Sequence, residues 1–390
     1  MCLACFSRRD TLKLAALFSG GALLRPRALH AASADAPVRI GYLPITDATP
    51  LLVAHARGLF QEAGLQSEKP VLLRSWSQVI EAFVAGQVNV VHLLSPMTIW
   101  ARFGAKAPLK VVAWNHVDGS ALTVAPNIGD IAALGGTTVA VPSWYSIHNV
   151  VLQDLFRANG LSAVTKRPNP GPKEVNLIVM APSDMPPAIA SQRVAGYIVA
   201  EPFNAMAEVL NVGKVLRFTG DVWKAHACCV VVMHQDDLQQ RPEWAQKVVD
   251  SVVKAQIWTR ANRAEAAKLL SKDAAAHYTP HTTALLDKVL APPPSDRTAY
   301  LADGAIRHAA WNEPRIDFQP FPYPSYTQEL VRRLKDTVVE GDRGFLGGLD
   351  PVAAEADLVD ASFVRKAIIA NGGMAAFGAD GFSRTETIAP

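Results

Sequence analysis

The chain has 390 residues, of which 49% are hydrophobic and 19% are charged. This composition is typical of a well-packed soluble α/β protein, and the length favours two lobes or domains over a single core. The formal net charge is +3. Residues 1–34 contribute five basic side chains and one aspartate, so residues 35–390 carry a net charge of about −1. A nearly neutral body excludes the dense basic face that nucleic-acid binding requires.

Residues 1–34 have the pattern of an export signal. The stretch S-R-R-D-T-L-K at residues 7–13 resembles the twin-arginine signal, and a short apolar run follows at residues 14–24. This run is too short to span a bilayer, and Ala31, Ala32 and Ala34 offer cleavage positions. We therefore predict a twin-arginine-type signal peptide at residues 1–34. The alternative is a disordered basic N-terminus that contains an incidental apolar run.

The predicted elements alternate between short apolar strands and helices. The first series comprises strand 38–45, helix 51–65, strand 71–76, helix 78–85, strand 88–94, helix 96–104 and strand 110–114. The second series comprises strands 121–126 and 138–142, helix 147–159, strand 175–180, helix 187–191 and strand 196–200. This βαβ order predicts mostly parallel sheets with helices on their faces.

The rest of the chain, from residue 227, is predicted to return to the first lobe. A strand at residues 227–233 leads into a long helical stretch at 242–272, and helices then alternate with proline-rich loops. We expect a C-terminal helical extension at residues 346–372. The glycine-rich residues 373–390 are predicted to be a disordered tail.

Two adjacent cysteines, Cys228 and Cys229, lie in the predicted return strand. Neighbouring residues of a strand point to opposite faces, so we expect these two to pack as small buried hydrophobes without forming a bond. A zinc site that uses them with His226 and His234 matches none of the usual ligand spacings. The other two cysteines, Cys2 and Cys5, are expected to leave with the signal peptide.

The loops that follow the predicted strands are where ligands bind in open α/β sheets. These loops contain few acidic residues and many hydroxyl groups, and several of them lead into helix N-termini, whose free N–H groups attract anions. Candidate ligand-binding residues among them are Thr46, Ser95, Ser143 and Ser146. The alternative is that these four residues only cap helices.

No sequence motif calls for catalysis. The chain contains no G-x-S-x-G, P-loop or H-E-x-x-H pattern, and no glycine-rich dinucleotide fingerprint follows its first strand. Its ten histidines are scattered, without an evident nucleophile beside any of them. We therefore predict that the protein is not an enzyme.

Residues 75–97 and residues 181–203 form a weak internal repeat. Each stretch has a helical part followed by an apolar run, and the two end at Ser95-Pro96 and Glu201-Pro202. Each end is predicted to face a shared cleft from its own lobe. Glu201 is expected to hold the lobes together rather than to contact an anion, because like charges repel.

Four stretches of the sequence carry a family resemblance. The motifs are RIGYLPITDATPLLVAHARGLF, AFVAGQVNVVHLLSPM, AIASQRVAGYIVAEPFN and TGDVWKAHACC. Together they resemble solute-binding proteins of ABC importers, within the nitrate–sulfonate–taurine group. The resemblance implies a type II periplasmic-binding-protein-like α/β fold, with two lobes joined by two crossover strands around a ligand cleft. It places lobe 1 at residues 38–118 and 227–345, and lobe 2 at residues 119–226.

The resemblance to nitrate-type members also implies particular ligand contacts. It points to Trp76 in the S-W pair, His148 after the second-lobe V-P turn, and Lys224 in G-D-V-W-K-A-H. Bicarbonate-binding relatives hold calcium with an acidic residue near the position of Lys224. Because Lys224 is basic, we expect no metal here, and no cofactor is expected either. Ser120 stands where nitrate binders have a glutamine, which leaves room for an anion larger than nitrate. The alternatives are that Trp76 packs in the core, that His148 caps a helix, and that Lys224 lies on the surface.

The predicted function is that of an exported solute-binding component of an ABC importer. It would capture a small anion, such as a nitrate-like oxyanion or an organosulfonate, in the periplasm and deliver it to a permease in the inner membrane. We expect a monomer that is exported by the twin-arginine machinery and binds no nucleic acid. The alternatives are the same scaffold binding a pyrimidine thiamine precursor, an enzyme similar to pyrimidine synthases, and a cytosolic ligand sensor.

Overall fold

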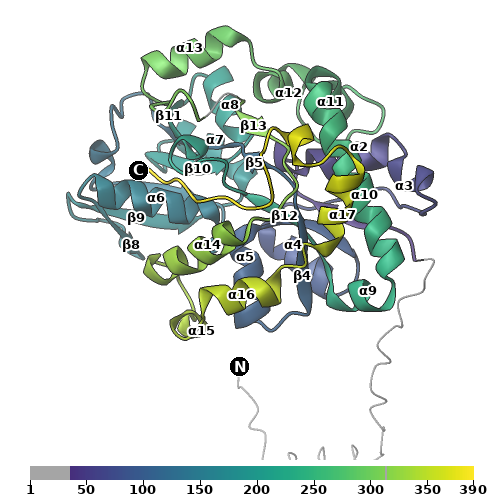
Figure 1. Cartoon of the computed structure of the whole chain (residues 1–390). Helices are drawn as coiled ribbons and strands as arrows, with labels where there is room; N and C mark the ends of the chain where they lie inside the picture. Colours follow the sequence, from purple (N-terminus) through teal and green to yellow (C-terminus); the bar gives the residue numbers. More distant parts are fainter. Residues whose placement is uncertain (1–35, 312–313) are drawn as a thin grey trace, which may run out of the picture. The chain divides into compact units, whose positions relative to one another are not determined.

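The computed structural model describes residues 36–311 and 314–390, so the predicted signal peptide lies outside the described residues. The described part belongs to one compact unit that spans residues 34–390. Within this part, no helix has both the length and the apolar character needed to cross a membrane. Figure 1 shows strands and helices alternating along the chain.

The first lobe is built on a five-stranded sheet. Its strands lie in the order β2 (Val71–Leu72), β1 (Ile40–Tyr42), β3 (Val90–Leu94), β12 (Cys229–His234) and β4 (Leu109–Trp114). β1 runs parallel to β2 and β3, whereas β12 pairs antiparallel with β3 and β4. β3 is buried along its whole length and β12 is buried in all but its last residue. The valine-rich sequences of these two strands fit burial on both faces of the sheet.

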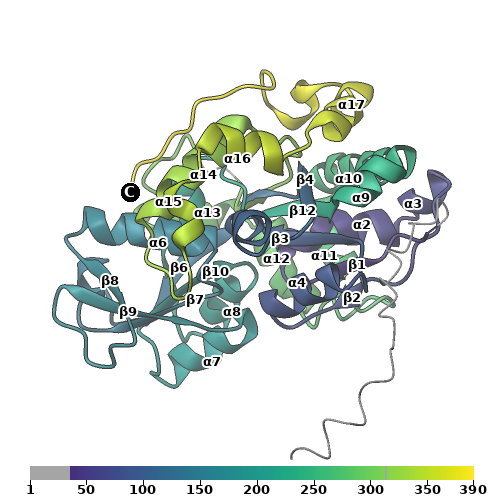
Figure 2. The same cartoon turned by 90° about the horizontal axis from the view of Figure 1, so that it is seen from below.

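The second lobe is built on a six-stranded sheet. Its strands lie in the order β11 (Lys214–Phe218), β6 (Ser120–Val124), β10 (Gly196–Ala200), β7 (Thr138–Val141), β9 (Glu174–Val179) and β8 (Ser162–Thr165). β10, β7, β9 and β8 are parallel, and β6 is antiparallel to both of its neighbours. In Figure 2, the strands of the two sheets form two separate groups, β6–β10 in one and β1–β4 with β12 in the other.

Two crossover segments join the sheets. The first, at residues 115–119, contains β5 (Val117–Asp118), which pairs antiparallel with β13 (Ile316–Asp317). The second, at residues 222–228, leads into β12. The predicted arrangement of two α/β lobes joined by two crossovers is therefore confirmed. This topology brings loops from both lobes to the crossovers.

Helices cover both sheets. The first lobe carries α2 (Thr49–Ala56), α3 (Leu59–Glu62), α4 (Trp76–Val84), α5 (Ser95–Ile99), α9 (Gln235–Gln240), α10 (Pro242–Ala261), α11 (Arg263–Leu270), α12 (Thr283–Leu290) and α14 (Pro324–Asp336). The second lobe carries α6 (Ile147–Ala158), α7 (Met185–Ala190) and α8 (Phe203–Val209). Further helices are α13 (Pro294–Ala302), α15 (Gly344–Gly347), α16 (Pro351–Leu358) and α17 (Ser362–Ala370).

The long helical stretch predicted for residues 242–272 is divided into two helices at Asn262. The structure has α10 and α11 there instead, with Asn262 between them. The Asn262 side-chain amide donates to the carbonyl oxygen of Trp258 at 2.8 Å. Asparagine is a poor helix former because its side chain competes for backbone hydrogen bonds, which explains the break.

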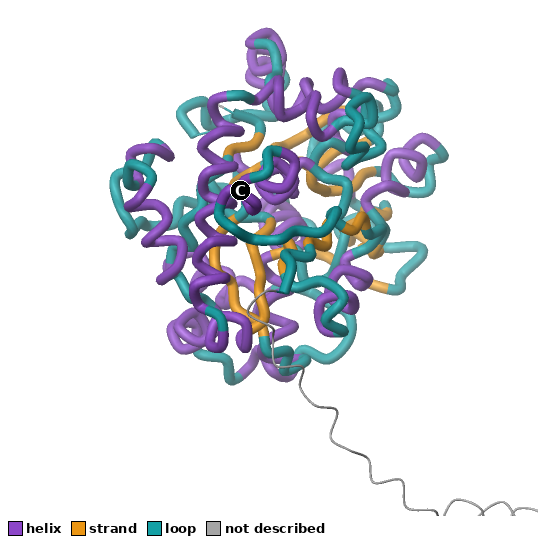
Figure 3. Tube along the Cα trace, turned by 90° about the vertical axis from the view of Figure 1, so that its right-hand side faces the viewer, coloured by secondary structure: helices purple, strands orange, loops and turns teal. Residues whose placement is uncertain are grey.

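The prediction of a disordered tail at residues 373–390 is wrong. The indole Nε1 of Trp223 donates to the carboxylate of Glu386 at 2.7 Å, and the backbone N–H of Ala389 donates to Val222 at 2.8 Å. In Figure 3, the C-terminal loop crosses the face of the molecule that is turned toward the viewer. Glycine content alone did not reveal these contacts, because they depend on a buried partner far away in the sequence.

Tyr326 of α14 packs between aromatic side chains from both crossover regions. Its ring lies 5.0 Å from that of Trp114 and 5.1 Å from that of Trp223, measured between ring centroids. Its hydroxyl group lies 2.8 Å from that of Ser95 and also donates to the carbonyl oxygen of Ala227. A residue late in the chain therefore supports the connection between the lobes.

Candidate functional site

Buried polar side chains gather where strand ends of both lobes meet the crossovers. We call this group the interlobe cluster; its members are Asp47, His92, His116, Ser120, His148, Thr219, His226, Cys228 and Cys229. Every member is almost completely shielded from solvent. Buried polar groups are costly unless they are paired, so this concentration of them is the candidate functional site.

Asp47 and His116 form the charged centre of the cluster. Oδ2 of Asp47 lies 2.8 Å from Nε2 of His116. Burial raises the pKa of Asp47 to about 6, although His116 opposes this rise. Burial also opposes charge on His116, but the Asp47 carboxylate outweighs it and raises the pKa of His116 to about 10. At neutral pH the two side chains therefore form a buried ion pair.

The two cysteines lie on the same side of the chain, contrary to the expectation of opposite faces. Their sulfur atoms are 3.9 Å apart, and both cysteines are unbonded. The expectation was wrong because Cys228 precedes β12 and lies in the irregular crossover, where strand alternation does not apply. The thiol of Cys229 donates to Oδ2 of Asp47 at 3.3 Å, which attaches the pair to the charged centre.

The thiols of the two cysteines differ in acidity. Burial raises the pKa of Cys228, but the neighbouring Cys229 thiol and the nearby imidazoles of His148 and His116 outweigh this and hold it well below its usual value. Burial and the neighbouring Cys228 raise the pKa of Cys229 well above its usual value. Cys228 is therefore the thiol of the pair that favours the thiolate form.

Two residues predicted as ligand contacts, Ser120 and His148, lie together in the interlobe cluster. The hydroxyl oxygen of Ser120 is 2.9 Å from Nε2 of His148, and the same nitrogen lies 3.8 Å from the sulfur of Cys228. His148 stands in the first turn of α6, directly after a helix start that is capped by the Ser146 hydroxyl, which accepts from Asn149 at 3.1 Å. The cap fixes the start of α6 and so positions His148 against the first crossover.

Trp76 lies beside the cluster and packs against His92. Their ring centroids are 5.4 Å apart, and both side chains are buried. Nε2 of His92 accepts a hydrogen bond from the backbone N–H of Leu43 at 2.9 Å. Burial lowers the pKa of His92 to about 3, so the ring is neutral and carries its proton on Nδ1.

The hydroxyl groups of Thr46 and Ser95 are bonded to backbone carbonyl oxygens and do not face a free space in the cluster. The hydroxyl of Thr46 donates to the carbonyl oxygen of Glu201 at 3.2 Å, and the Thr46 backbone N–H donates to the same oxygen at 2.9 Å. The Ser95 hydroxyl donates to Ala227 at 3.1 Å. These bonds tie the first lobe to the second lobe and to the second crossover.

The remaining predicted contacts, Ser143 and Lys224, lie outside the cluster. Ser143 is half-buried in the loop between β7 and α6, where its carbonyl oxygen accepts from the Ser146 hydroxyl at 2.8 Å. The Lys224 side chain is exposed, and its backbone N–H donates to Thr387 of the C-terminal segment at 3.0 Å. The structure therefore does not bring Lys224, a predicted ligand contact, to the buried site.

Glu201 carries out the lobe-holding role that the sequence predicted for it. Its carboxylate is fully buried and lies 2.6 Å from the guanidinium group of Arg315, which is also buried. The second carboxylate oxygen accepts from the backbone N–H of Ala205 at 3.1 Å, at the start of α8. Because Arg315 belongs to the segment that precedes β13, this ion pair links the second lobe to the support of the first crossover.

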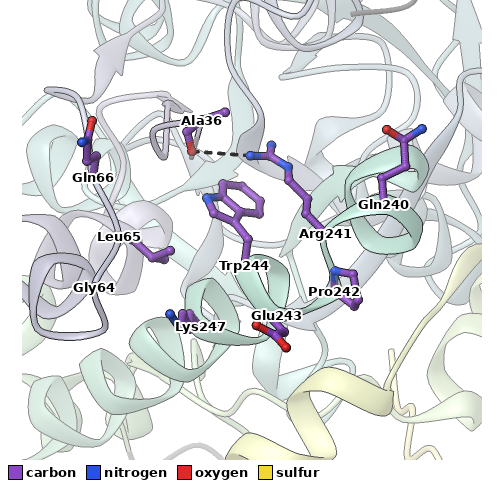
Figure 4. Close-up of a pocket in the computed structure, with 10 residues that line it drawn as sticks. All are labelled: Ala36, Gly64, Leu65, Gln66, Gln240, Arg241, Pro242, Glu243, Trp244 and Lys247. Carbon is purple, nitrogen blue, oxygen red and sulfur yellow. Dashed lines mark hydrogen bonds between the residues drawn. The ribbon is translucent and has the colours of Figure 1, made fainter. Parts of the chain in front are cut away.

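A groove of about 600 Å³ on the first lobe lies apart from the interlobe cluster (Figure 4). The cation at its centre, the guanidinium group of Arg241, already has two partners. It lies 3.6 Å above the Trp244 ring and 2.9 Å from the Asp237 carboxylate. The groove is lined by Ala36, residues 64–66 and residues of α9 and α10, two helices that follow the end of β12 opposite to Cys229. We therefore do not assign the functional site to this groove.

Several polar atoms of the interlobe cluster and its border are buried without a hydrogen-bond partner in the described structure. They are Oδ1 of Asp47, Nε1 of Trp76, and Nδ1 of His92, His116, His148 and His226. Only two of these side chains, Trp76 and His148, had been predicted from the sequence as ligand contacts. The signal for His92 was a single polar residue inside an apolar strand, V-V-H-L-L.

The two-lobed α/β topology, with paired crossovers and a buried polar site between the lobes, is that of the periplasmic binding proteins. The chain matches the model of the NMT1-like family over residues 31–271, and it belongs to that family.

Individual relatives share modest sequence identity with the chain. The nitrate/nitrite binding protein NrtA of a Nostoc strain is 25% identical over 275 residues, which cover 63% of this chain and 60% of NrtA. The crystal structure of the nitrate-binding protein NrtA of Synechocystis has a TM-score of 0.70 at 19% identity, covering 90% of this chain and 93% of that one. The aliphatic sulphonate binding protein SsuA of Escherichia coli has a TM-score of 0.55 at 18% identity, covering 77% and 85%. The chain thus spans about three-fifths of the length of the curated relative that it matches.

Proposed function

We propose that this protein is the solute-binding component of an ABC importer and captures a small anion between its lobes. The candidates are a nitrate-like oxyanion and an organosulfonate. The periplasmic-binding-protein fold and the relatives named for nitrate and sulfonate binding support this proposal. The observation that carries it is a pair of buried N–H donors without partners, Nε1 of Trp76 and Nδ1 of His92.

These two donors suit an anion for a simple chemical reason. The indole nitrogen of Trp76 only donates, and Nδ1 of His92 must carry its proton because Nε2 accepts from Leu43. A buried donor without a partner costs about 1–3 kcal/mol, and an oxyanion removes that cost when it accepts from both. The two aromatic rings also exclude water, which strengthens each hydrogen bond.

The rest of the site defines how the lobes enclose the ligand. Ser120 and His148 contribute the second-lobe side, and the bonds of Thr46 to Glu201 hold the lobes together around it. Closure of two lobes over a ligand is the usual hinge motion of this fold. Ser95, Ser143 and Ser146 support the walls through backbone contacts, and Lys224 is left out because its side chain is exposed.

The proposal extends to export and delivery. Residues 1–34 act as a twin-arginine-type signal peptide that directs the chain to the periplasm, with cleavage near Ala31–Ala34. There the protein works as a monomer and delivers its ligand to a permease of the inner membrane. It performs no chemical step, because binding and release alone complete the transport role.

A thermal-shift panel tests the proposed function. The panel contains nitrate, nitrite, bicarbonate, taurine, a longer alkanesulfonate and a pyrimidine thiamine precursor. A true ligand at about 100 times its Kd adds about 2.7 kcal/mol of stability, which corresponds to a rise in Tm of about 4 °C for a unit of this size. Only an anion is expected to produce this rise.

Two tryptophan variants locate the response. Trp76→Phe keeps an aromatic ring, although a smaller one, and removes the N–H donor, so it is expected to abolish the anion-induced shift. Trp244→Phe is the matched control, because its Nε1 is also buried without a partner but lies at the groove of Figure 4. No shift with any anion, or equal shifts in both variants, overturns the proposal.

A further inference from the structure

Four side chains of the interlobe cluster present metal-ligand atoms at close range. One ligand atom each from Asp47, His116, Cys228 and Cys229 lies within 4.8 Å of all the others, and all four side chains are buried. In the part of the chain that the structure describes, this is the only group of three or more such residues with that geometry. Two thiols, an imidazole and a carboxylate form a ligand set that zinc and related transition metals bind.

The spacings fit a tetrahedral ion. With Zn–S distances of about 2.3 Å and Zn–N or Zn–O distances of about 2.0 Å, two sulfur ligands lie roughly 3.8 Å apart and mixed pairs roughly 3.3–3.5 Å apart. The two sulfur atoms are 3.9 Å apart, and the sulfur of Cys229 is 3.3 Å from Oδ2 of Asp47. The distance of 2.8 Å between Asp47 and His116 widens on binding, because a metal replaces the proton that they share.

Unsatisfied atoms at the same place provide a second, independent observation. Oδ1 of Asp47 and Nδ1 of His116 are buried and have no hydrogen-bond partner. Among the described residues, no lysine or arginine forms an ion pair with Asp47, whose ion-pair partner is His116. The unpartnered Oδ1 therefore gives Asp47 a second oxygen that a divalent cation can bind.

The four ligands come from three separate segments. Asp47 follows β1, His116 lies in the first crossover, and Cys228 and Cys229 belong to the second crossover and the first residue of β12. Their spacing along the chain therefore resembles no metal-binding motif, although the folded chain assembles them. We propose that Asp47, His116, Cys228 and Cys229 form a buried binding site for one thiophilic transition-metal ion, for which Zn²⁺ is the probe.

This site is separate from the proposed anion contacts, because it uses none of the donors of Trp76 and His92. The metal joins both crossovers to the first lobe, so its binding stabilises the folded chain. Failure of the metal site leaves the anion proposal standing, and failure of the anion panel leaves the metal site standing. The two tests use different ligands and different variants.

The experiment uses the full chain with Cys2→Ser and Cys5→Ser, so that Cys228 and Cys229 are its remaining cysteines. The reduced, metal-free protein is titrated with Zn²⁺ against a chromogenic chelator, and with Co²⁺ under optical absorption. We expect one ion per chain, a thiolate-to-cobalt band in the near ultraviolet and the visible bands of tetrahedral cobalt. Binding of Zn²⁺ is also expected to protect both thiols from alkylation.

Substitutions of the proposed metal-binding residues test the metal site. Cys228→Ser and Asp47→Asn, which nearly preserve side-chain volume, are each expected to weaken Zn²⁺ binding by at least about 10-fold to 100-fold. His277→Ala is the control, because His277 is exposed and lies outside the interlobe cluster. If Cys228→Ser fails to fold, Asp47→Asn decides on its own. Absence of stoichiometric binding, or unchanged affinity in the folded variants, overturns the proposal.

Discussion

The carboxylate of Glu201 and the guanidinium group of Arg315 form a buried ion pair at 2.6 Å that connects the second lobe to the segment supporting the first crossover. Arg315 also donates to the hydroxyl of Tyr300 at 2.7 Å. Two buried charges stabilise each other only while both are present. This relationship makes the lobe connection sensitive to single substitutions.

Arg315→Met is expected to destabilise the protein by about 3–5 kcal/mol, because it leaves the charge of Glu201 buried without its partner. Urea denaturation of the variant and the wild type measures the difference. Arg332→Met serves as the control, since Arg332 is half-exposed and its ion pair with Glu329 contributes less than about 1 kcal/mol. Equal losses in both variants contradict a special role for the Glu201 pair.

The loss in Arg315→Met is expected to depend on pH. Burial raises the pKa of Glu201, and Arg315 opposes that rise, so the variant raises the pKa further. The folded variant then holds a proton that the unfolded chain releases above the ordinary glutamate pKa, so its stability relative to wild type falls as pH rises. Denaturation at pH 5 and at pH 8 checks this sign. A smaller deficit at pH 8 than at pH 5 contradicts it.

Gly119→Ala, in the first crossover, is expected to destabilise the protein more than Gly136→Ala does. Gly119 has φ of +77°, and a Cβ atom added there meets Cδ1 of Ile316 at 2.8 Å. Gly136 has a similar φ of +80° but nothing within 4 Å of its Cβ position. Gly136→Ala therefore costs about 1–2 kcal/mol of backbone strain, and Gly119→Ala costs this plus the steric clash. Thermal unfolding of both variants isolates the clash as the difference.

Glu386→Ala is expected to release the C-terminal segment. Its carboxylate accepts from Nε1 of Trp223 at 2.7 Å and from the hydroxyl of Ser325 at 2.8 Å, and it pairs with Arg384. Loss of such a charged acceptor costs about 2 kcal/mol and leaves the buried indole nitrogen without a partner. Hydrogen exchange of residues 382–390 is expected to accelerate. The exposed Glu81 provides the control variant Glu81→Ala, which is expected to change stability by less than about 0.5 kcal/mol.

Much of the architecture was predictable because it depends on local patterns. The apolar runs of β3 and β12 and the alternation of strands and helices predicted mostly parallel sheets with helices on their faces, whereas the two crossovers were implied by the family resemblance. The helix break at Asn262 and the ordered C-terminal segment were missed. Each depends on a contact whose partner a local pattern does not reveal, such as the bond between Trp223 and Glu386.

The site was predicted only in part for a related reason. Ser120 and His148 were each named, but only the folded chain shows that they are hydrogen-bonded to each other. His92 and His116 were missed because no spacing joins them to a motif. The two cysteines were interpreted as strand residues, whereas the crossover geometry turns both sulfur atoms toward Asp47.

Tyr326 touches both crossover regions, although it lies almost a hundred residues after the second crossover ends. All strands of both large sheets have therefore left the ribosome before the residue that supports their connection is synthesised. A nascent chain that stops before α14 is expected to contain two formed sheets without a finished cleft. Competence to bind is thus acquired late in translation, which gives a newly made chain a period without captured ligand.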